Sequence, residues 1–285
     1  MSVATSLAVP RRDSGGPWRV CMLLLACALA PPALAGSCGS PVLDANVGTE
    51  RSRWSEFDGA GGRLVKEGGW LKTVTVGAGL ECAGWTWQGH VQHAQGNRDY
   101  DGRSNNGAPL QTSSDIRRQR LDLQAWRPGS EALAFGAQLN WTMLDRDIAG
   151  VGWVKGYPEQ FRYLQAAVGA RYAVSDIAGM RFGVEAWLGA GPAGHVTVQL
   201  PGFDEARLRL GRSQWARLGL SLSSTEAAPQ VAGWGWQLRL DLRQENTRAG
   251  QPQPLYRHGV LAGGAVQPKF RQTSVGLDAG LRYRF

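Results

Sequence analysis

Apolar and polar residues alternate without a break from Ser274 to Phe285, the last residue of the chain. Successive side chains of a β-strand point to opposite faces, so this segment predicts a strand with one apolar face and one polar, arginine-containing face. The apolar face would consist of Val275, Leu277, Ala279, Leu281, Tyr283 and Phe285.

The same alternation recurs along most of the chain, in segments whose lengths suit the roughly 9–11 residues of a tilted membrane-crossing strand. It is clear at 118–125, 133–143, 164–174, 181–188, 216–223 and 234–243, and weaker at 51–67, 71–82 and 85–97. With the last segment these predict an all-β fold, a single antiparallel transmembrane β-barrel of about ten strands. A soluble β-sandwich would expose the same apolar faces to water as large patches.

The links between these segments alternate in length. Short links fall at 82–84, 127–130 and 175–179, with a longer one at 225–231, while longer or more polar links fall at 98–111, 149–157, 199–206 and 249–271. Outer-membrane barrels alternate periplasmic turns with longer extracellular loops in this way. The pattern predicts that both ends of the barrel chain are periplasmic.

The first 35 residues have the layout of a secretory signal peptide. A basic segment precedes a short apolar run, and Ala33-Leu34-Ala35 forms a small-x-small cleavage site. We therefore expect a signal peptide at 1–35, a periplasmic tail at 36–50 and the barrel at 51–285. Removal of the signal leaves Cys38 and Cys82 as the only cysteines, and export favours a disulfide between them. Two isolated cysteines predict no metal site, and no cofactor is expected.

The chain carries a formal net charge of +8. Such an excess is compatible with nucleic acid or with an anionic membrane surface. The chain has no nucleic-acid-binding motif and no lysine-rich run, and its arginines are spread through the predicted strands. A nucleic-acid partner is therefore not expected.

The signal layout, the alternating strands and the terminal Leu281-Arg282-Tyr283-Arg284-Phe285 resemble outer-membrane proteins that are delivered to the barrel-assembly machinery. This resemblance covers the mature chain. It implies a Gram-negative outer-membrane location, contact with outer-membrane lipid and lipopolysaccharide, and the assembly machinery as a transient partner. It implies no particular activity.

Asp99 and Asp101, with the ten-strand plan, are similar to one half of the site of the omptins, a family of surface proteases. Omptins pair an Asp-x-Asp in the second extracellular loop with an Asp-x-His in the fourth. Here the fourth loop contains Asp204 but no histidine beside it, and His195 has the wrong spacing. The resemblance implies Asp99 and Asp101 as catalytic residues, whereas the residues alone also fit a simple loop start.

The polar strand faces contain many arginines, and two interpretations of the lumen fit them. They could form a charge lattice with Asp and Glu that fills the barrel, or line a small anion-selective channel. At the predicted third loop, Arg146, Lys155 and Arg162 are expected to bind lipopolysaccharide phosphates. The leading hypothesis is a non-enzymatic barrel whose loops contact lipopolysaccharide or an external partner. The enzyme alternatives are an omptin-like protease and a lipid A hydrolase.

Overall fold

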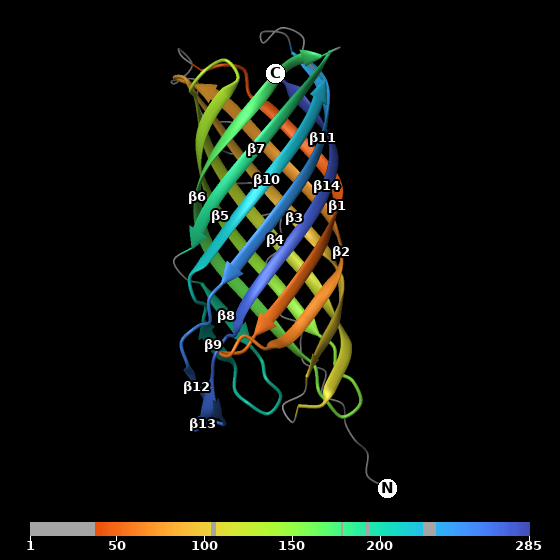
Figure 1. Ribbon diagram of the computed structural model, residues 1–285, viewed down its shortest axis with the longest axis vertical. Coiled ribbons are helices and arrows are strands. Elements are labelled where there is room, and N and C mark those ends of the chain that lie inside the picture. The colour runs from red at the N-terminus through yellow and green to blue at the C-terminus, as the bar shows by residue number, and fades with distance from the viewer. Residues whose placement is uncertain (1–37, 104–106, 178, 192–193, 225–231) are drawn as a thin grey trace. The chain divides into compact units, whose positions relative to one another are not determined.

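The computed structural model describes residues 38–103, 107–177, 179–191, 194–224 and 232–285. The described part of the chain has no helix that is long and apolar enough to cross a membrane. Ten antiparallel strands form a closed barrel (Figure 1). They are β1 (Val42–Phe57), β2 (Arg63–Cys82), β3 (Trp85–Arg103), β4 (Pro109–Pro128), β5 (Leu133–Ile148), β6 (Tyr157–Ile177), β7 (Met180–Gly191), β10 (Ser213–Ser224), β11 (Gly233–Thr247) and β14 (Lys269–Arg284).

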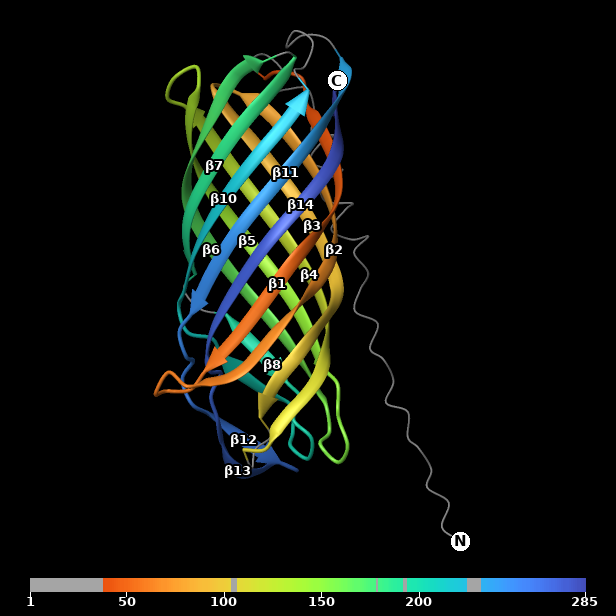
Figure 2. The ribbon, with the colours of Figure 1, turned by 45° about the vertical axis from the view of Figure 1, so that its right-hand side comes forward.

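The barrel closes between the first and last strands. β1 pairs with β14 from Val42 opposite Arg284 to Phe57 opposite Lys269, and the two strands run side by side in both ribbon views (Figure 2). β5 pairs with β6 on the other side of the sheet. Every barrel strand therefore has two hydrogen-bonded neighbours, which leaves no open edge.

Two short hairpins lie outside the ten barrel strands. β8 (His195–Val198) pairs with β6 and with β9 (Ala206–Arg209), and β12 (Gln253–Arg257) pairs with β13 (Val260–Ala265). Both hairpins lie at the end of the barrel opposite Phe285 (Figure 1). We call this the loop end, and the end that carries Cys38 and Phe285 the turn end.

The predicted alternation determines the two faces of the barrel wall. Apolar side chains cover its outer surface, and polar and charged ones line the inside. The exposed apolar belt includes Val47, Val74, Val76, Leu123, Phe135, Leu139, Val168, Leu188, Leu218, Leu242, Val275, Leu277 and Leu281. The expected fold class, a closed antiparallel barrel of about ten strands, is confirmed.

The first strand differs from the prediction. β1 begins at Val42, so residues 42–50 belong to the barrel and not to a tail, and the segment 51–67 contains the turn 58–62. The apolar alternation stops after Val47, because the next outward positions are Thr49, Arg51 and Arg53. Gly48 is required because an added Cβ would lie 2.4 Å from the Leu277 carbonyl oxygen. The expected signal peptide at 1–35 lies outside the described residues.

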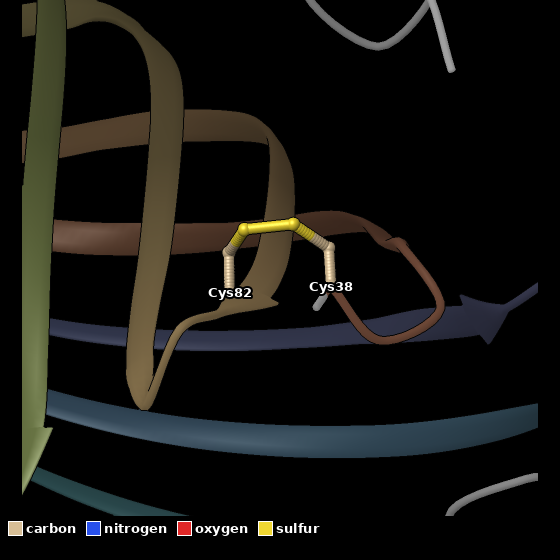
Figure 3. Close-up of a disulfide and its surroundings, with 2 residues drawn as sticks. All are labelled: Cys38 and Cys82. Carbon is tan, nitrogen blue, oxygen red and sulfur yellow. A yellow bond between two sulfur atoms is a disulfide. The ribbon is translucent and has the colours of Figure 1, made fainter. Parts of the chain in front are cut away.

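Cys38 and Cys82 form a disulfide at the turn end (Figure 3). Their Cα atoms lie 4.1 Å apart, and the Gly39 N–H donates to the Glu81 carbonyl oxygen at 2.8 Å. The bond joins the segment before β1 to the last residue of β2.

Candidate functional site: lumen, loop end and outer rim

An apolar cluster lies inside the barrel near the loop end. Trp54 of β1 stacks on Phe270 of β14 with ring centroids 4.1 Å apart, and Phe161 of β6 meets Trp54 edge-on at 5.4 Å. The two hairpins and the segments beside them add buried side chains to this cluster, namely Val196, Val198, Ala206, Leu208, Leu210 and Leu255. The hairpins therefore pack apolar residues against the inner wall of the barrel. In an open pore, water would occupy this space.

A buried ion cluster adjoins these rings. The Arg146 guanidinium lies 2.9 Å from a carboxylate oxygen of Glu56 and of Glu159 and 3.7 Å from one of Glu67. It also sits over the Trp54 ring at 5.3 Å. Removing one partner from such a buried cluster typically costs about 3–5 kcal/mol, because the remaining charges stay unpaired.

This position contradicts the expectation that Arg146 binds lipopolysaccharide at the surface. Its side chain is 1% exposed and points into the lumen. The reason is parity: β5 continues as a regular strand to Ile148, so Arg146 shares the inward face with Asn140 and Thr142. Lys155, in the connection 149–156, and Arg162, on the outer face of β6, are both exposed.

Asp99 and Asp101 lie within β3 and not in a loop. Both side chains are exposed on the outer face, while the intervening Tyr100 is buried inside. Asp101 lies 3.7 Å from Arg63. The pair therefore faces away from the lumen, beside a cation of the neighbouring strand.

The four histidines give no catalytic grouping among the described residues. His90 lies 3.6 Å from Asp44 inside the barrel, and His93 lies 3.5 Å from Gln95. None of the hydrogen bonds in the described chain joins a histidine to a serine, and no described group of His, Cys, Asp and Glu could hold a metal ion. Among the described residues there is therefore no hydrogen-bonded Ser–His pair of the kind a lipid A hydrolase would use.

The two hairpins are joined to each other by polar contacts that the sequence did not predict. The Asp204 carboxylate accepts hydrogen bonds from the backbone N–H groups of His258 at 3.0 Å and Gly259 at 2.8 Å. The hydrogen bond from the Gly259 N–H lowers the pKa of Asp204. Burial opposes this shift, and the His258 N–H adds to it. The Arg257 Nε donates to the Gly202 carbonyl oxygen at 3.0 Å. These contacts fix the turn between β12 and β13 against the turn between β8 and β9.

His195, at the start of β8, packs against basic side chains. One guanidinium nitrogen of Arg207 lies 3.2 Å from the His195 Nδ1. Burial and then the charges of Arg207 and Arg162 lower the pKa of the His195 imidazole. The ring is therefore kept neutral and able to accept from Arg207.

The middle of the lumen is polar and densely paired. Arg118 donates to both carboxylate oxygens of Glu50, at 2.8 and 2.6 Å, and Arg217 pairs with Glu185. A cavity of about 70 Å³ lies among these side chains. Toward the turn end, Trp126, Trp187 and Trp215 form a second buried aromatic cluster on the inner wall.

The outer face at the loop end carries a row of cations on three adjacent strands, which we call the basic rim. It consists of Lys269 and Arg271 on β14, Arg51 and Arg53 on β1, and Lys72 on β2, all exposed. Arg51 lies between Val275 and Trp70 in the sheet register, and its guanidinium sits 5.8 Å from the Trp70 ring.

The basic rim borders the apolar belt directly. Thr49, opposite Leu277 and Lys72, marks the border, and Val47 and Val74 lie one step closer to the turn end. The nearest outward carboxylates among the described residues are Asp99 and Asp101 on β3, which adjoin Gly68 and Lys66 and not the rim itself. The rim was missed in the sequence because its members come from both ends of the chain.

No protein-family model and no curated protein matches the sequence. Solved structures do match. The outer-membrane protease OmpT from Escherichia coli is similar with a TM-score of 0.53 and 9% identity, over 86% of this chain and 97% of that chain. The translocator domain of the autotransporter NalP from Neisseria meningitidis has a TM-score of 0.46 and 10% identity, over 94% of this chain and 96% of that one. The similarity to OmpT and the closed antiparallel sheet show that the chain has the barrel fold of outer-membrane proteins.

Proposed function

We propose that this chain is a non-conducting barrel of the Gram-negative outer membrane that binds lipopolysaccharide phosphates on the basic rim. The observation that carries the proposal is the basic rim itself, five cations on three adjacent strands directly above the apolar belt. Arginine and lysine bind phosphate through charge-assisted hydrogen bonds. Clustered cations at a membrane surface each add about 1 kcal/mol of attraction to anionic lipid.

The surroundings of the rim suit a lipid ligand. A phosphorylated headgroup at Arg51 and Arg53 would place its acyl chains along Val47, Val275 and Leu277. Trp70 is 59% exposed at the same level, where an indole ring serves as an interfacial anchor. A soluble anion would gain nothing from this apolar border, so the arrangement favours a lipid.

The interior supports a barrel that does not conduct. The Trp54–Phe161–Phe270 cluster is covered by residues of both hairpins, and paired arginines such as Arg118 lie buried in the lumen beyond it. Purified protein in planar bilayers should give no steady single-channel current. A reproducible anion-selective current would contradict this part of the proposal and favour the channel interpretation.

Lipopolysaccharide binding tests the rim. The triple variant Arg51→Gln, Arg53→Gln and Lys72→Gln should bind lipopolysaccharide vesicles about a hundredfold more weakly at low salt than the unmodified protein. Arg117→Gln is the matched control, because Arg117 is an outward arginine that lies opposite Asp145. Equal binding by the triple variant and the control, both folded, would refute the rim as the binding site.

A test for turnover of peptides and of lipopolysaccharide distinguishes this proposal from the two enzyme alternatives, a protease and a lipid hydrolase. The outward position of Asp99 and Asp101 supports a role in surface charge. Refolded protein incubated with a mixed peptide pool and lipopolysaccharide should leave both unchanged by mass spectrometry. Peptide cleavage that is lost in the Asp99→Ala, Asp101→Ala variant would establish proteolysis instead, and release of fatty acid would establish a lipid hydrolase.

A further inference from the structure

The cavity in the middle of the lumen is lined by side chains from most of the barrel wall. It measures about 70 Å³, several times the roughly 10–15 Å³ that one water-sized particle needs. Four arginines and four carboxylates line it, namely Arg120, Arg217, Arg239, Arg243, Glu50, Asp122, Asp241 and Asp278. Because the arginines and carboxylates are equal in number, the formal charge of the lining favours neither a bound anion nor a bound cation. The hydrogen bonds and ion pairs of each side chain indicate which kind of ion the cavity suits.

The carboxylates of the cavity are largely satisfied by protein groups. Glu50 accepts two hydrogen bonds from Arg118, which lies behind the cavity wall. Asp122 accepts from the side-chain amides of Gln138 and Asn140. Asp278 accepts from the Thr73 hydroxyl at 2.7 Å.

Asp241 is the remaining carboxylate of the cavity. One of its oxygens lies 3.6 Å from the Arg217 Nε, and the other lies 3.6 Å from the Arg239 Nε. Arg217 and Arg239 are thus both ion-paired with Asp241. Each of the four carboxylates thus has a protein partner, although the contacts of Asp241 are ion pairs and its buried Oδ1 accepts no hydrogen bond from the described protein groups.

Arg120 differs from the other cations because of its missing ion pair, and Arg243 shares with it a buried nitrogen that has no hydrogen-bond partner. Arg217 has such a nitrogen too, but its Nε lies 3.6 Å from an Asp241 oxygen. In the part of the chain that the structure describes, no carboxylate lies within ion-pairing distance of Arg120, and its buried Nε has no protein hydrogen-bond partner. Arg243 binds Gln165 and Glu245 through its Nη2, at 2.8 and 3.1 Å, but its buried Nη1 has no protein partner. Both side chains line the same cavity, Arg120 from β4 and Arg243 from β11.

We propose that this cavity is a binding site for a small inorganic anion, held by Arg120 and Arg243. Guanidinium groups only donate hydrogen bonds, so the unsatisfied groups call for an acceptor. The charge of Arg243 is met by Glu245, but the buried charge of Arg120 has no carboxylate within ion-pairing distance among the described residues, and a buried charge is costly without a nearby opposite charge. An anion there would stabilise the polar middle of the barrel and does not require an open pore.

Bromide is a suitable probe because its anomalous scattering locates it. Crystals of the refolded mature protein, soaked in sodium bromide, should show an anomalous peak within hydrogen-bond distance of Arg120 and Arg243. In solution, the protein should broaden the bromide NMR line. Arg120→Gln should abolish both the peak and this broadening, and Arg120→Lys, which keeps the charge, should retain part of both.

Arg181→Gln is the matched control, because Arg181 is an exposed arginine near the turn end. It should leave the peak and the broadening unchanged. The heat-dependent shift in gel mobility verifies that each variant is folded. The proposal is overturned by a folded, unmodified protein without a peak in the cavity, by a cavity peak that survives Arg120→Gln, or by peaks on exposed arginines alone.

Discussion

The carboxylate of Asp204, in the turn between β8 and β9, accepts a hydrogen bond of 2.8 Å from the backbone N–H of Gly259, in the turn between β12 and β13. The adjacent His258 N–H donates to the same carboxylate at 3.0 Å. His258 and Gly259 have positive φ angles of 52° and 78°, so this tight turn presents two N–H groups to one acceptor. Two loops that are distant in sequence are thereby held together at the loop end.

Replacing Asp204 with alanine should separate the hairpins without unfolding the barrel. The substitution removes the carboxylate that accepts from the His258 and Gly259 N–H groups. Amide hydrogen exchange at these two residues should therefore become severalfold faster, while exchange in β1 and β14 stays unchanged. Glu205→Ala is the control, since Glu205 contacts only Gln199, at 3.2 Å, among the described hydrogen bonds. Unchanged exchange at Gly259 would mean that Asp204 does not hold the turn.

Acidification should loosen the β8–β9 hairpin through His195. Its pKa lies below the ordinary 6.5, because burial and the charges of Arg207 and Arg162 disfavour the imidazolium. Folding lowers the pKa of His195, so the neutral ring stabilises the folded state at pH values above the unfolded-state pKa of about 6.5. This stabilisation is lost as the pH falls through the lower pKa of the folded state. An NMR titration of the ring should give an apparent pKa below 6.5, and Arg207→Gln should raise it. A value at or above 6.5 in the unmodified protein would contradict the packing described.

Arg146 and Arg162 should differ sharply when replaced by methionine. Arg146→Met leaves Glu56, Glu67 and Glu159 buried together, so the free energy of unfolding should fall by about 3–5 kcal/mol. Arg162→Met removes an exposed cation and should change it by less than about 0.5 kcal/mol. Urea unfolding in lipid vesicles, followed by tryptophan fluorescence, measures both. Equal effects would argue against the buried ion cluster.

Reducing the disulfide should destabilise the barrel without preventing its closure. Cys38 and Cys82 are separated by 44 residues, and closing a loop of that length stabilises a fold by up to about 4 kcal/mol. β1 keeps its pairing with β2 and β14, so the barrel should still form. The midpoint of heat unfolding should drop on reduction, and Cys38→Ser should remove that response. A reduced protein that fails to insert would show a larger role for the bond.

The strands could be predicted because lipid imposes one rule on the whole outer face. Leu139 and Val275 must be apolar wherever they touch acyl chains, so the alternation is regular there. Every second residue of β5 from Asn140 and Thr142 onward faces inward, so continuing this alternation to Arg146 would have placed Arg146 inside. β1 was misplaced because Thr49, Arg51 and Arg53 occupy outward positions that are apolar in the other strands. The Asp204–Gly259 contact depends on the meeting of distant loops, which no local pattern encodes.

The pairing of β1 with β14 has a consequence for the order of biogenesis. Val42 of β1 pairs with Arg284 of β14. β1 therefore has only β2 as a hydrogen-bonded neighbour until β14 has been synthesised. Until that moment β1 would present an unsatisfied edge, which invites association with other chains. We therefore expect a truncation that removes only β14 to leave an aggregating product in place of a smaller barrel.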